Sequence, residues 1–250
     1  MDRSSPPGPA RGDFQKSDRT GFLLGMAALI AAMCVAGFAK TYFLPLWRGT
    51  FAGNWVFHVH GALLFGWVAL FVVQIALVRR GQVAVHRKLG VLALVLVPAV
   101  VASTFAVSVA TMRRDLAAGL GPVAMSSLLG VVTSMAWFAG LVALGLHWRR
   151  QPAVHKRLVF LATVAVMWPA AFRFRHYFPS VPHPEIYFGL VLPDALILVA
   201  MARDWFAARK IHPVYWIGGT TLIVEQSLEV LLFDSPAWRQ IAAALAAPFL

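Results

Sequence analysis

The chain has 250 residues, of which 60% are hydrophobic and only 13% are charged, and its mean hydropathy is +0.72. This composition excludes an ordinary soluble domain and is typical of an integral membrane protein. The net charge of +12 does not predict a nucleic-acid partner, because the Lys and Arg residues stand in twos and threes between apolar stretches. The predicted partner is the lipid bilayer. The single cysteine, Cys34, excludes an intrachain disulfide and a cysteine metal cluster.

The chain begins with a polar segment, residues 1–20, that is rich in Pro, Gly and Arg. It has too few apolar residues to fold alone, so we predict a disordered cytoplasmic tail. The apolar run that follows, residues 21–44, is longer than the core of a signal peptide and leads into further apolar runs. We therefore predict that it is an uncleaved first membrane helix.

Apolar runs continue along the chain, and a membrane-spanning helix needs about 20 such residues. We predict an all-α membrane bundle over residues 21–233 with about seven transmembrane helices, the fifth and sixth being short. The predicted spans are residues 21–44, 55–78, 89–111, 122–146, 158–174, 186–201 and 214–233. The connections are short, which favours antiparallel packing of consecutive helices.

One sequence pattern occurs twice. AVHRKL, which contains His86, returns 69 residues later as AVHKRL, which contains His155. Trp67 and Trp137 stand at similar distances upstream, so the repeating unit is predicted to be a whole helical hairpin, at about 55–111 and 122–174. The two hairpins, helices two and three and then four and five, would form a four-helix core. The duplication is parallel, because helices two and four run in the same direction.

The basic residues predict the orientation of the bundle. Most of the 22 Lys and Arg residues fall on the side that holds the N-terminus and both copies of the repeat. The positive-inside rule then predicts a bacterial cytoplasmic (inner) membrane protein with its N-terminus cytoplasmic and its C-terminus external. Beyond the last span, Asp234-Ser235-Pro236 resembles a helix N-cap followed by proline. Residues 234–250 are therefore predicted to form a short external interfacial helix.

Histidines are the first candidate functional residues, since polar side chains at membrane depth usually face the bundle interior. His58 and His60 are two residues apart near the outer start of the second span, so they cannot point the same way. His60 shares its stripe with Gln74 and is predicted to face inward, whereas His58 is predicted to lie nearer lipid. His86 and His155 lie at the cytoplasmic boundary.

A second group of polar residues is predicted at the outer level of the bundle. Glu225 and Glu229 are four residues apart and share one helix face. Ion pairs that lock the last three helices together, or a substrate or proton site, would both explain the group. The predicted outer polar site consists of Arg173, Asp194, Glu225, Glu229 and Gln74, with Arg175, His60 and His176 at the same level.

The patterns FHVHG, which contains His60, and HRKLG, which contains His86, carry a resemblance. They resemble a group of uncharacterised bacterial multi-pass membrane proteins with a His-x-His-Gly helix and a His-Arg-x-Leu-Gly helix. More distantly, residues 55–175 look like the cytochrome b561 group, whose four central helices hold two haems between histidines at the two membrane faces. The resemblance implies an inner haem between His86 and His155. The outer half of the fourth span, residues 122–129, has no histidine, so His176 would substitute there opposite His60.

The first functional hypothesis is a redox protein that transfers electrons in the membrane. Haem b, or another imidazole-bound metal, would lie between His86 and His155, with a second site near His60 and His176. Gly90 and other small neighbours would leave room for a macrocycle. The alternative explanation of the repeat is an interfacial anchor, in which the basic side chains reach the headgroups.

Two further functions remain open. One is an outer-leaflet metal-dependent membrane hydrolase, in which His60, His176 and a carboxylate would hold zinc. The other is a cofactor-free small-molecule or proton-coupled carrier that uses Arg173, Asp194 and Glu225.

Overall fold

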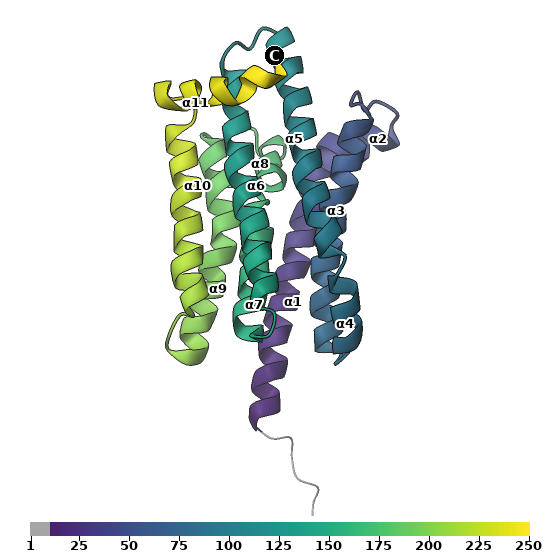
Figure 1. Ribbon diagram of the computed structural model, residues 1–250, viewed down its shortest axis with the longest axis vertical. Helices are drawn as coiled ribbons and strands as arrows, with labels where there is room; N and C mark the ends of the chain where they lie inside the picture. Colours follow the sequence, from purple (N-terminus) through teal and green to yellow (C-terminus); the bar gives the residue numbers. More distant parts are fainter. Residues whose placement is uncertain (1–10) are drawn as a thin grey trace, which may run out of the picture.

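Long apolar helices run side by side in the computed structural model, which describes the backbone of residues 11–250 and the side chains from residue 20 onward (Figure 1). The described residues form helices and their connections, without a strand. Five helical segments are long and apolar enough to cross a membrane: Thr20–Trp47, Trp55–Arg79, Ala93–Ala117, Val123–His147 and Glu185–Ala208. Pro152–Ala165 and Trp168–His176 make a sixth if the pair, bent by 42°, is one span. The protein thus has the helical framework of an integral membrane protein.

The helices have the following bounds. The α-helices are α1 (Arg11–Phe38), α2 (Leu44–Trp47), α3 (Trp55–Arg79), α4 (Val83–Gly90), α5 (Ala93–Ala117), α6 (Val123–His147), α7 (Pro152–Ala165), α8 (Trp168–Phe172), α9 (Leu192–Ala208), α10 (Thr220–Leu232) and α11 (Pro236–Ala246). Short π-helical segments are η1 (Ala39–Phe43), η3 (Glu185–Val191) and η4 (Val214–Gly219), and short 3₁₀ segments are η2 (Arg173–His176) and η5 (Ala247–Phe249).

The predicted all-α membrane bundle is confirmed, with differences in individual helices. The predicted third span is divided, because α4 ends at Gly90 and α5 starts at Ala93. The fifth is bent between α7 and α8, where Pro169 lies in the first turn of α8 and cannot continue the hydrogen bonds of α7. α10 has only 13 residues and is not among the candidate spans, although it runs along the bundle with η4 (Figure 1).

The N-terminal end of the bundle also differs from the prediction. α1 already begins at Arg11, whereas residues 1–20 were expected to be disordered. A helix that is established in the apolar segment extends at little cost into a preceding polar one, since propagation is easier than nucleation. Residues 1–10 lie outside the described part of the chain.

The two predicted hairpins lie beside each other. α3 packs on α5, α5 on α6 and α6 on α7, while α1 packs on both α3 and α8 and so closes the ring. Trp67 of α3 reaches into the middle, where its Nε1 donates to Thr163 Oγ1 of α7 at 3.3 Å. Its ring meets Phe138 of α6 edge-on, with 4.9 Å between ring centroids. This contact joins the two hairpins across the core.

The chain ends in the helix expected after the last span. Ser235 Oγ accepts from the Trp238 backbone N–H at 3.3 Å, which is the predicted N-cap. α11 lies across one end of the bundle (Figure 1), and Trp238 Nε1 donates to the Ser126 carbonyl of α6 at 2.8 Å. That end is called the α11 end below, and the opposite end, where α4 and α7 begin, is called the histidine end.

Docking of α11 depends on an acid at its start. Asp234 is ion-paired with Arg239 and accepts from Ser126 Oγ at 2.7 Å. Hydrogen bonds from Arg239 and then Ser126 lower the pKa of Asp234 from 3.8 to about 2. A lowered carboxyl pKa contributes stability that is present above the unfolded-state value and is lost as the pH falls through the folded-state value. Docking of α11 is therefore expected to weaken from about pH 4 to about pH 2.

This dependence is measurable as hydrogen–deuterium exchange of residues 236–246 across that pH range. The Asp234→Asn variant is the control, because residue 234 then has no carboxylate that can be protonated. It should exchange faster than the native chain above pH 4 and show a much weaker pH response. Equal pH dependence in both proteins would show that Asp234 does not hold α11.

Candidate functional site

His86 and His155 face each other at the histidine end of the bundle. Their ring centroids are 6.4 Å apart and the ring planes cross at 83°. Each residue lies in the first turn of its helix, where the backbone N–H of His86 donates to Gln82 and that of His155 donates to Gln151. The two copies of the repeat thus bring equivalent imidazoles together from α4 and α7.

A backbone carbonyl orients the His155 ring. Nδ1 of His155 lies 2.7 Å from the Gly145 carbonyl oxygen of α6, which can only accept, so Nδ1 donates. Nε2 of the neutral ring then keeps its lone pair for a ligand. A Cβ at Gly145 would lie 3.0 Å from Val159 Cγ2, so glycine permits this close approach of α6 and α7. Sequence reasoning did not include Gly145, because its contribution is a backbone oxygen.

Gln74 of α3 belongs to this end, which corrects its assignment to the outer polar site. Its Nε2 would lie 3.1 Å from a Cβ at Gly90, and its backbone lies within hydrogen-bonding reach of His86. The helical rise explains the error, since Gln74 is 14 residues beyond His60 in the sequence, or roughly 21 Å along the helix. The space beside Gly90, expected to admit a macrocycle, is therefore occupied by the Gln74 amide.

Two polar atoms around His86 lack a hydrogen-bond partner. Nδ1 of His86 and Oε1 of Gln74 are both buried and unpaired. Buried polar atoms are normally hydrogen-bonded, so each of these two atoms is an exception among the described residues. Burial is the main cause that lowers the pKa of His86 below 6.5, with smaller contributions from His155 and Arg87, and the Gln74 backbone opposes it. The imidazole of His86 is therefore neutral at neutral pH.

The histidines near the α11 end are not brought together in the same way. His60 faces α5, with its Nδ1 3.3 Å from Ser103 Oγ. His58, predicted nearer lipid, is instead 2.8 Å from the Tyr42 hydroxyl. The His176 carbonyl accepts from Lys40 Nζ at 3.0 Å. Among the described residues, no group of three or more His, Cys, Asp or Glu side chains is arranged to hold a metal ion.

The predicted outer polar group separates into two parts. Arg173 turns toward α1, where its Nε donates to Thr41 Oγ1 at 3.1 Å and its guanidinium lies over the Phe38 ring at 4.2 Å. Arg175 lies over the Phe172 ring at 3.8 Å. Within the described part of the chain, neither guanidinium forms an ion pair with an acid. Ion pairs from Arg173 or Arg175 therefore do not join the last three helices.

The carboxyl groups of the outer group lie on α9 and α10. Asp194 is only 5% exposed, and neither of its oxygens has a hydrogen-bond partner. Glu225 lies within hydrogen-bonding reach of Glu229 and of Thr133 on α6. Both Glu229 oxygens would lie 3.9 Å from a Cβ at Gly130 of α6. The two glutamates therefore face α6 rather than lipid.

A buried ion pair that the sequence did not reveal joins α7 to α9. Arg157, from the second copy of the repeat, donates through NH2 to both oxygens of Asp204 at 2.7 and 2.8 Å. The same guanidinium lies over the Tyr215 ring at 5.2 Å. A small cavity beside the pair, lined in part by Phe22 and Lys156 and by neither histidine of the facing pair, borders α1. Arg157 thus stabilises the packing of α7 against α9, whereas its counterpart in the first copy of the repeat, Lys88, is exposed.

Comparisons of the chain with protein-family models, with curated proteins and with solved structures return no match. The class of the protein therefore follows from its own features. It is a multi-pass helical membrane protein in which a duplicated hairpin places two histidines opposite each other at one end.

Proposed function

We propose that the protein is a membrane electron-transfer protein that binds haem b between His86 and His155. The observation that carries the proposal is the facing of the two imidazoles, whose ring centroids are 6.4 Å apart. An imidazole nitrogen lies about 2 Å from a metal that it binds and its ring centre about 1 Å farther, so two imidazoles on opposite sides of one metal have centres about 6 Å apart. The observed spacing agrees with that value, but a macrocycle between the rings would require the Gln74 amide beside Gly90 to move aside.

The number of ligands favours haem over zinc. A structural zinc site takes four protein ligands and a catalytic one takes three, but the described residues contain no group of three suitable side chains. Haem iron needs only axial ligands from the protein, because the macrocycle supplies the other four. Two histidines alone are therefore sufficient for haem.

The surrounding residues would support the two ligands. The Gly145 carbonyl accepts from Nδ1 of His155, an outer contact that orients metal-binding histidines and increases their basicity. Arg87 and Lys88 are exposed next to His86 and would supply positive charge for the carboxylates of the cofactor.

The proposed ligand set also indicates the type of chemistry. Haem b, when bound, supplies a one-electron couple within the membrane. His86 and His155 would both hold the cofactor, and two protein ligands are typical of electron transfer rather than oxygen activation.

The test is an absorption spectrum combined with metal analysis of protein purified in detergent from haem-replete cells. We expect a Soret band, about one iron per chain, and a spectrum that changes on reduction with dithionite. A colourless preparation without iron would overturn the proposal, and about one zinc per chain would favour the membrane hydrolase instead.

A further inference from the structure

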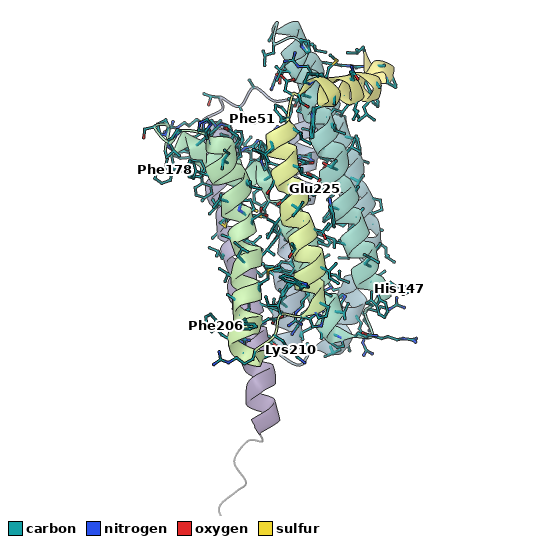
Figure 2. The ribbon with its side chains drawn as sticks, turned by 90° about the vertical axis from the view of Figure 1, so that its left-hand side faces the viewer. Phe51, His147, Phe178, Phe206, Lys210 and Glu225 are labelled. Carbon is teal, nitrogen blue, oxygen red and sulfur yellow. The ribbon has the colours of Figure 1, made fainter. Side chains whose placement is uncertain are left out.

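A second polar site lies away from the histidine end. Figure 2 shows Glu225 in the half of the bundle toward α11, far from His147 and Lys210 at the opposite end. The glutamates at 225 and 229 are one turn apart on α10 and therefore share one face of that helix. One oxygen of each is buried without a hydrogen-bond partner. This site does not depend on the proposed haem.

We propose that Glu225 and Glu229 form a proton-binding site that holds one shared proton, with Asp194 as the next proton acceptor. Two carboxylates in contact cannot both be ionised in an apolar setting, because their charges repel and neither is solvated. A single proton removes one charge and supplies the hydrogen bond that joins the two groups. Proton binding is therefore the chemistry that this contact favours.

No cation among the described residues neutralises the pair. On α10 and the elements around it, η3 carries Glu185, whose partner is His183 at 3.2 Å, and α11 carries Arg239, which pairs with Asp234. α6 presents the hydroxyl of Thr133 and the bare backbone of Gly130. α9 presents Asp194, which adds a further carboxyl close enough to interact with Glu225.

Two other buried side chains point to the same conclusion. Asp194 and Gln226 are 5% and 7% exposed, and both Asp194 oxygens and Gln226 Oε1 lack a donor. Carboxyl and amide oxygens at membrane depth are costly unless a donor reaches them. The described acids do not form a group of three or more side chains arranged to hold a metal ion, so a metal ion is not the partner that we propose for these oxygens. A proton needs only two oxygens.

The test is infrared spectroscopy of the full chain in lipid nanodiscs, which separates the C=O band of a protonated carboxyl from carboxylate bands. We expect such a band at neutral pH, with a large loss of its area in the Glu225→Gln/Glu229→Gln double variant. Each single variant should shift the band, because the hydrogen-bond partner changes. Thr133→Val, which keeps the side-chain shape, should also shift it.

Glu185→Gln is the matched control, because the Glu185 side chain is 42% exposed and paired with His183, and it should leave the band unchanged. Absence of the band in the wild-type protein at neutral pH would overturn the proposal. A folded double variant that keeps the whole band would also overturn it. If the double variant does not fold, the two single variants decide, and an unshifted band in both would contradict the shared proton.

Discussion

With haem bound as proposed, replacing His155 with alanine is expected to lower the haem retained per chain to less than about a tenth of the wild-type value. The variant would lose a direct ligand, whereas loss of an outer contact alone changes metal affinity about 10–100-fold. His86→Ala should have the same effect, since the two imidazoles face each other at 6.4 Å. The measurement is Soret absorbance per mole of folded protein after purification, with haem supplied during expression.

His147→Ala is the matched control for these variants. His147 is exposed at the end of α6 and its ring meets the Trp148 ring edge-on, so its loss should leave haem content unchanged. Equal haem content in His86→Ala, His155→Ala and His147→Ala would show that the facing histidines are not the ligands.

The second large effect is expected at the buried ion pair between α7 and α9. The side chains of Arg157 and Asp204 are 9% and 14% exposed, so Asp204→Ala leaves a guanidinium uncompensated in an apolar setting. Loss of one partner of such a pair destabilises a protein by about 3–5 kcal/mol. The expected result is a clear fall in the thermal midpoint of unfolding in detergent, measured for native and variant protein without added cofactor.

Two further variants distinguish charge burial from general sensitivity. Asp115→Asn removes the acid of an exposed pair, in which the Arg114 side chain is 66% exposed, and should change stability by less than about 0.5 kcal/mol. The double replacement Arg157→Met/Asp204→Leu should recover much of the loss, because a buried pair exchanged for apolar side chains is often neutral. A double variant as unstable as Asp204→Ala would contradict this explanation.

The sequence predicted the positions of most spans because the length of an apolar run is itself the property that a bilayer requires. α3 starts at the predicted residue 55, and α6 lies within one residue of its predicted bounds. The breaks within the predicted spans were harder to predict. The division between α4 and α5 has no proline at the break, and it depends on local packing that hydropathy does not contain.

The candidate site was predictable to different extents. The repeat alone identified His86 and His155 as a pair, because a parallel duplication places equivalent residues at one level. The outer group shows the limit of that argument, since equal depth does not specify the direction of a side chain. Arg173 turns toward Thr41 on the side of α1, whereas Glu225 faces Thr133 of α6. Helical periodicity gives the face of one helix but not the neighbour that the face meets.

The most direct measurement of the central claim is the electron paramagnetic resonance spectrum of the oxidised, purified protein. Haem iron held by two imidazoles is low-spin when oxidised. We therefore expect a low-spin ferric signal of about one spin per chain. A high-spin ferric signal, or no haem iron in protein from haem-replete cells, would contradict a cofactor held between His86 and His155.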